Sequence, residues 1–233
     1  HVRSRRQRQM CIRDRKGMKE IIQELKNFLK PKDIGTDSDR ALLLDFQATL
    51  EIKPEKAIKL EKDALAQIEN ITADNARLVS NLHANLGGLY RMNGHPDLAR
   101  EHMEKSISLL DQFNLLHIND SIPQIANYAM FLTEQQEPER GISELQKLSG
   151  IIKEYHSDDC LDYAKVQETL GTIYLMTANL PQAKTHFKRA FKIYEKIWAD
   201  EPEMIEAKYQ EIQELYPQIG FCIGKNLSGL LTK

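Results

Sequence analysis

The sequence repeats itself with a period of 42 residues. Three prolines are spaced at this interval, and each is followed three positions later by a small residue: Pro54 with Ala57, Pro96 with Ala99, and Pro138 with Gly141. Pro181 and Ala183 continue the series, with the proline one position late. A period between about 20 and 50 residues indicates an array of similar units that stack on their neighbours instead of one globular core.

Each unit is predicted to contain two amphipathic helices. Leu82, Leu86, Leu89 and Tyr90 follow the spacing of a helix with one apolar face. The proline then marks the start of a second helix, where its missing N–H costs nothing. The small residue after it allows the two helix backbones to approach closely. Neither helix is stable alone, so we expect an all-α fold of antiparallel helix pairs.

Matching columns in the two helices carry a family resemblance. The best copy has Leu170, Gly171, Tyr174, Ala183, Phe187 and Ala190. These residues resemble the tetratricopeptide repeat (TPR), in the 42-residue variety of kinesin light chains and bacterial signalling proteins. The column that holds Trp in this family holds His83, Ile125 and Gln167 instead. The resemblance implies a right-handed α-α superhelix, or solenoid, of antiparallel helix pairs.

The repeats are predicted to fill residues 16–233. Clear repeats lie at about 80–121, 122–163 and 164–205, a weaker one lies at 38–79, and partial units lie at 16–30 and 206–233. In the weaker repeat, Asp45 and Glu61 stand where small and aromatic residues are expected. Residues 1–15 form a separate basic tail.

The basic tail conceals the charge of the rest of the chain. Six arginines and one aspartate give residues 1–15 a charge of +5, so the remainder carries −7 of the net −2. The stretch from Gln7 to Arg15 resembles translated adaptor sequence, and the chain begins at His1, so we expect an artefact joined to a fragment. An acidic body argues against nucleic-acid binding.

The same composition argues against a membrane protein and a disulfide framework. No run approaches the roughly 18 apolar residues that a membrane span requires. Three cysteines without a Cys-x-x-Cys pair favour a reducing compartment, so we expect a cytoplasmic protein.

The sequence offers few groups for catalysis. It lacks the common phosphate-loop, zinc-protease and nucleophile-elbow motifs. His156, Asp158, Asp159 and Cys160 could ligate zinc, but a helix N-cap at Ser157 or Asp158 explains them as well. His102 and His186, 84 residues apart, indicate a solvent-facing repeat feature. We therefore predict no enzyme activity, no cofactor and no metal.

The resemblance implies that a partner binds the concave groove lined by the first helices. Its columns hold three polar residues, Asn85, Asn127 and Thr169, three methionines, Met92, Met130 and Met176, and two cations, Arg91 and Lys165. The polar side chains could hydrogen-bond a peptide backbone, and flexible methionines suit varied apolar segments. Alternatively, the polar groups bond within their own helices and the methionines pack between repeats.

We therefore expect a non-catalytic scaffold that binds a protein or peptide segment in this groove. The alternative is the sensor or regulatory arm of a larger bacterial signalling ATPase or transcription regulator whose effector domain precedes the fragment. The fold analogy supplies both hypotheses.

Overall fold

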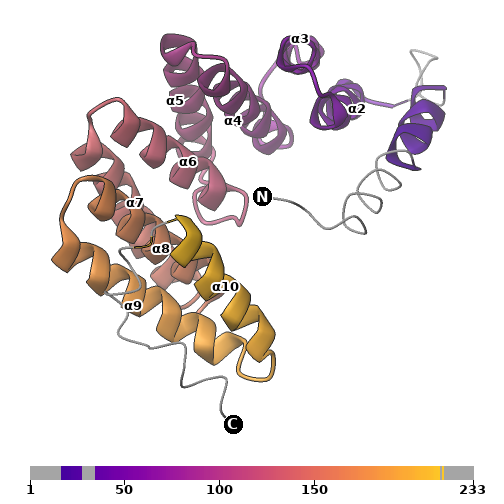
Figure 1. Ribbon diagram of the computed structural model, residues 1–233. Helices are drawn as coiled ribbons and strands as arrows, with labels where there is room; N and C mark the ends of the chain where they lie inside the picture. The colour runs from indigo at the N-terminus through magenta and orange to yellow at the C-terminus, as the bar shows by residue number, and fades with distance from the viewer. Residues whose placement is uncertain (1–16, 28–34, 216, 218–233) are drawn as a thin grey trace. The chain divides into compact units, whose positions relative to one another are not determined.

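The secondary structure of the described residues is entirely helical (Figure 1). The structure is a computed structural model, and it describes residues 17–27, 35–215 and 217. The chain divides into two compact units, His1–Leu115 and Leu116–Lys233. The predicted all-α class is confirmed.

Unit 1 contains two helix pairs that follow a helix over residues 17–27. The pairs are α2 (Asp37–Leu50) with α3 (Pro54–Leu65) and α4 (Ala76–Met92) with α5 (Pro96–Gln112). Short connections make the helices of each pair antiparallel neighbours. Helix α4 also packs against α3 and α2, and this contact joins the two pairs.

Unit 2 also contains two helix pairs, which are followed by one more helix in the position of the first helix of a repeat. Its elements are α6 (Ser121–Glu134) with α7 (Pro138–Tyr155), α8 (Leu161–Met176) with α9 (Leu180–Ile197), and α10 (Pro202–Leu215). Helix α8 packs on both α6 and α7. The stacked ring of Tyr209, with its centroid 4.2 Å from that of Phe191, attaches α10 to α9.

The proline column marks the start of every second helix. Pro54, Pro96 and Pro138 are the first residues of α3, α5 and α7. Pro181 occupies the second position of α9, because that helix begins at Leu180. The one-residue delay in the sequence is therefore accommodated inside the first turn, where a backbone N–H has no partner in the helix.

The turn within a pair also recurs every 42 residues. Gly94, Gln136 and Ala178 have positive φ angles of 74°, 66° and 58°. After each of them, the next backbone N–H donates to a carbonyl near the end of the first helix, as in His95 N–H to Tyr90 O at 2.9 Å. This is the hydrogen bond of a left-handed helix cap, which reverses the chain tightly.

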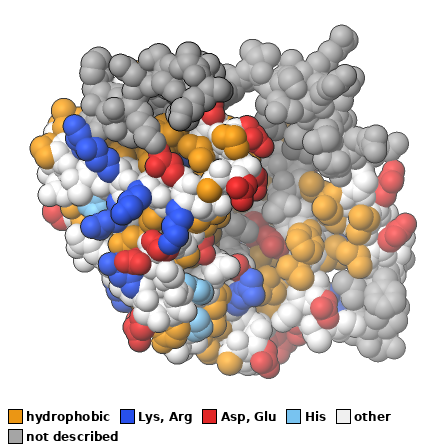
Figure 2. Space-filling model, turned by 90° about the horizontal axis from the view of Figure 1, so that it is seen from below, with side chains coloured by type: hydrophobic (Ala, Val, Ile, Leu, Met, Phe, Trp, Pro, Cys, Tyr) orange, Lys and Arg blue, Asp and Glu red, His pale blue; other side chains and the backbone are white. Residues whose placement is uncertain are grey.

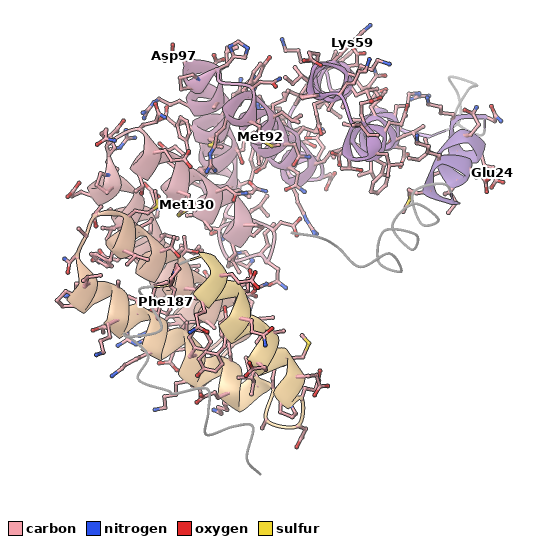
Figure 3. All side chains as sticks on the ribbon, viewed as in Figure 1. Glu24, Lys59, Met92, Asp97, Met130 and Phe187 are labelled. Carbon is pink, nitrogen blue, oxygen red and sulfur yellow. The ribbon has the colours of Figure 1, made fainter. Side chains whose placement is uncertain are left out.

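Small residues let the helices of a pair approach. Ala57, Ala99 and Ala183 are buried in the second helices. On the first helix α8, a Cβ added to Gly171 would lie 2.8 Å from the ring of Phe187 on α9; Figure 3 labels Phe187. A Cβ on Gly141 would lie 2.6 Å from the backbone oxygen of Ala129. The small column therefore sets the distance between the two helices.

Parts of the predicted organisation lie outside the described residues. These parts are the basic tail at 1–15 and the end of the partial unit at 206–233. The exact repeat boundaries stay a prediction. Among the described helices, none is both long enough and apolar enough to cross a membrane.

Candidate functional site

The residues predicted to line the groove all lie on first helices. Within unit 1, α4 carries Asn85, Arg91 and Met92; within unit 2, α6 carries Asn127 and Met130, and α8 carries Lys165, Thr169 and Met176. Because α6 packs against α8, the positions of unit 2 share one helical layer.

The methionines differ in exposure. Met92 is 82% exposed and Met176 is 46% exposed, whereas Met130 is half-buried on α6 (Figure 3). An exposed thioether is an available apolar contact, while a half-buried one contributes to packing as well. The packing alternative therefore does not explain Met92 and Met176.

The polar groove positions are used unequally. The Thr169 hydroxyl donates to Lys165 O in its own helix at 2.9 Å, and the Lys165 ammonium lies 3.5 Å from Asp162. The Asn127 side chain is exposed and makes no hydrogen bond with the described part of the chain. Of these positions in unit 2, Asn127 offers the amide that is available to a partner.

Asn85 instead binds two carboxyl groups inside unit 1. Its Nδ2 donates to Asp45 Oδ1 at 2.9 Å and to Glu61 Oε1 at 3.3 Å. Asp45 stands in α2 and Glu61 in α3, at the columns where Gly171 and Phe187 meet in α8 and α9. The off-pattern acids thus form one cluster with Asn85.

Burial dominates the electrostatics of this cluster. Glu61 is 2% exposed, and its Oε2 has no hydrogen-bond partner among the described residues. Burial, together with the adjacent Asp45 carboxylate, raises the pKa of Glu61 to about 9. Burial also raises the pKa of Asp45. Glu61 is therefore protonated at neutral pH and can donate to the Asp45 carboxylate.

Glu168 takes part in the attachment of α10 to α8 and α9. The Tyr194 hydroxyl donates to Glu168 Oε2 at 2.6 Å, and Lys208 Nζ lies 2.9 Å from Glu168 Oε1. Burial, followed by the Glu168 charge, raises the pKa of Tyr194. The Glu168 carboxylate is therefore engaged within unit 2.

The repeated histidines are structural and half-buried. His102 Nδ1 lies 2.8 Å from His83 Nδ1, and His186 Nδ1 lies 2.9 Å from Gln167 Oε1. Each histidine also stacks on the signature tyrosine of its pair, Tyr90 or Tyr174. Burial lowers the pKa of His83 to about 4 and also lowers the pKa of His102 and of His186. The prediction that both face solvent is wrong, because each bonds to the residue in the Trp column of its pair.

The loop between α7 and α8 is a cap rather than a cluster of ligands. Cys160 is the N-cap of α8, and its Sγ accepts from Tyr163 N–H at 3.4 Å. This places the cap later than the predicted Ser157 or Asp158. Asp159 pairs with Lys196, and His156 bonds to His117 O. In the described residues, no three His, Cys, Asp or Glu side chains are grouped to hold a metal ion.

Unit 2 also contains a basic hollow that was not predicted from the sequence. It has a volume of about 710 Å³ and lies between the end of α7, the α7–α8 loop and α9. Its cations are Lys153, Lys188, Arg189, Lys192 and Lys196. The spacing of Lys184, Lys188, Lys192 and Lys196 at four residues could have revealed a basic helix face.

The helix pairs and their shared columns define a helical-repeat protein. Residues 121–196, which span α6 to α9, match the tetratricopeptide repeat family model. The recognition of tetratricopeptide repeats in the sequence is therefore confirmed. No curated protein matches the chain.

Most of the chain is similar in fold to solved TPR solenoids. BtubC (BKLC) from P. vanneervenii is 20% identical, with a TM-score of 0.65 over 79% of this chain and 73% of that one. Kinesin light chain TPR-like repeats from Podosopora anserina are 14% identical, with a TM-score of 0.65 over 84% of this chain and 96% of that one. MamA is 16% identical, with a TM-score of 0.54 over 79% and 92%. At these identities the likeness establishes the fold class alone.

Proposed function

We propose that this protein is a non-catalytic scaffold that binds a protein or peptide segment on the first-helix face of unit 2. The observation that carries the proposal is the exposure of Asn127 and Met176 on the packed helices α6 and α8. An amide that has no hydrogen bond to the described residues can bind a peptide backbone, and a flexible thioether can contact the peptide's side chains.

Only some of the predicted groove residues have side chains that are available to a partner. Asn85 is committed to Asp45 and Glu61, and the Thr169 hydroxyl to its own helix. Lys165 remains exposed beside Asp162 and can exchange this weak surface pair for a partner carboxylate. The binding residues that we propose in unit 2 are therefore Asn127, Met130, Lys165 and Met176.

Selection of peptides from a displayed library against the full chain tests this function. Peptides selected by the wild-type protein should bind the N127A/M130A variant at least about tenfold more weakly, since a lost hydrogen bond and a lost apolar contact together exceed about 1.4 kcal/mol. The matched control is Q146A/I151A, which removes one exposed amide and one half-buried aliphatic group from the second helix α7. Equal affinity of both variants for the selected peptides would overturn the assignment.

A further inference from the structure

The basic hollow of unit 2 is built by elements other than the proposed groove. It is lined by residues of α7, the α7–α8 loop and α9, together with Tyr163 at the start of α8. The groove positions of unit 2 lie on α6 and farther along α8. Figure 2 shows one face of the molecule, on which Lys and Arg side chains gather with Asp and Glu between them.

Two aspartates neutralise only part of the positive charge. Asp159 pairs with Lys196, and Asp158 lies 4.0 Å from Lys153. The other three cations, Lys188, Arg189 and Lys192, make no ion pair with a described residue. Five cations and two anions therefore leave the hollow with a net charge of +3.

The fold does not require this concentration of charge. Lys188 and Lys192 stand four residues apart on α9, where like charges destabilise a helix. Both are exposed, so neither packs in the core. Arg189 adds a planar guanidinium that can hold a carboxylate through two parallel hydrogen bonds.

The hollow also has an apolar floor and an adequate size. Tyr163 and Ile193 are 3% and 4% exposed, and the Lys153 ammonium lies 5.3 Å from the centroid of the Tyr163 ring. A volume of about 710 Å³ falls in the range of about 300–1,000 Å³ that is usual for ligand pockets. Such a space accommodates a few peptide residues rather than a single ion.

We propose that the basic hollow is a second binding site, for a short acidic polypeptide segment. The cations bind side-chain carboxylates, and the aspartates at Asp158 and Asp159 can accept hydrogen bonds from peptide N–H groups. The same aspartates would repel the continuous phosphate chain of a nucleic acid. The site is independent of the groove and adds a second contact surface to the scaffold.

Fluorescence anisotropy of a fluorescein-labelled peptide of alternating glutamate and alanine, titrated with the full chain at low salt, tests the proposal. The wild-type protein should bind it saturably, and K188Q/K192Q should bind at least about tenfold more weakly. R189K should also bind more weakly, because an ammonium cannot replace the guanidinium fork. The control K147Q/K184Q removes two charges outside the hollow and should change the affinity by less than about twofold.

Three results would overturn the site. The first is an equal loss of affinity in both double variants, which would indicate attraction to the net charge alone. The second is equal binding of a peptide with glutamine in place of glutamate. The third is a preference for oligothymidylate that depends on the same lysines, which would make polyphosphate the occupant. The N127A/M130A variant should bind the acidic peptide normally, and circular dichroism checks that every variant is folded.

Discussion

Asn85 on α4 donates a hydrogen bond of 2.9 Å to Asp45 on α2. The same amide reaches Glu61 on α3, so one side chain connects three helices of unit 1. In unit 2 the equivalent columns of α8 and α9 hold Gly171 and Phe187, which meet by apolar packing. In the α2–α3 pair of unit 1, this contact is replaced by a polar cluster around the buried Glu61, which keeps its proton at neutral pH.

Substitution of Glu61 by Gln should stabilise unit 1 at neutral and alkaline pH. The pKa of Glu61 rises from 4.5 in the unfolded chain to about 9 in the fold, so its contribution is complete below 4.5 and is lost as the pH rises through 9. A glutamine amide can donate to Asp45 and accept from Asn85 without taking up a proton. The free energy of unfolding at pH 7 should increase by up to about 3 kcal/mol.

Urea denaturation between pH 5 and 9 measures this effect, and E69Q in the exposed loop after α3 is the control. The wild type and E69Q should lose stability across this range by the same amount, whereas the E61Q curve should be flatter. Parallel curves for all three proteins would contradict a protonated Glu61.

His83 should titrate far below its ordinary pKa. Burial and the contact with His102 lower its pKa from 6.5 to about 4, because an Nδ1–Nδ1 distance of 2.8 Å requires at least one neutral ring. Since the unfolded chain takes up this proton more readily, the stability due to neutral His83 is present above pH 6.5 and declines as the pH falls toward 4. An NMR titration of the imidazole carbons measures the pKa, and titration near 6.5 would contradict the buried pair.

Local chemistry explains why the helices could be predicted from the sequence. A proline fits the first turn of a helix whatever surrounds it, so Pro54, Pro96 and Pro138 identified the starts of α3, α5 and α7. The small residue three positions after the proline likewise indicates a close contact between the two helices of a pair.

The polar sites depend on contacts between helices that cannot be predicted from the 42-residue repeat. Asp45 and Glu61 were visibly off-pattern, but the role of Asn85 depends on α4 packing over both α2 and α3. The basic hollow similarly needs the α7–α8 loop to lie beside α9. Such arrangements arise from tertiary packing, which a column of residue types does not reveal.

Two glycines in α7 should respond oppositely to alanine. A Cβ at Gly141 would lie 2.6 Å from Ala129 O in the backbone of α6, so G141A must push the helices apart and should cost about 1–3 kcal/mol. A Cβ at Gly150 meets no atom within 4 Å, so G150A should gain up to about 1 kcal/mol from helix propensity. Chemical denaturation compares the two variants, and a stabilising G141A would show that this contact does not set the spacing.

Exchange of backbone amide hydrogens should reveal how α10 is held. Lys208 bridges to Glu168 on α8 at 2.9 Å and to Glu211 within α10 at 3.2 Å. E168Q removes the charge that joins two helices and that accepts the hydrogen bond from the Tyr194 hydroxyl, whereas E211Q removes only an ion pair within α10.

Loss of a partly buried charged hydrogen bond costs about 1.5–3 kcal/mol, so amides in residues 202–215 should exchange at least about tenfold faster in E168Q. E211Q should exchange as the wild type does, because an exposed pair within one helix contributes about 0.3–0.5 kcal/mol. Exchange in E168Q at the wild-type rate would contradict a role of Glu168 in holding α10, and would leave the Phe191–Tyr209 stack and the Tyr209–Glu195 hydrogen bond as its attachments.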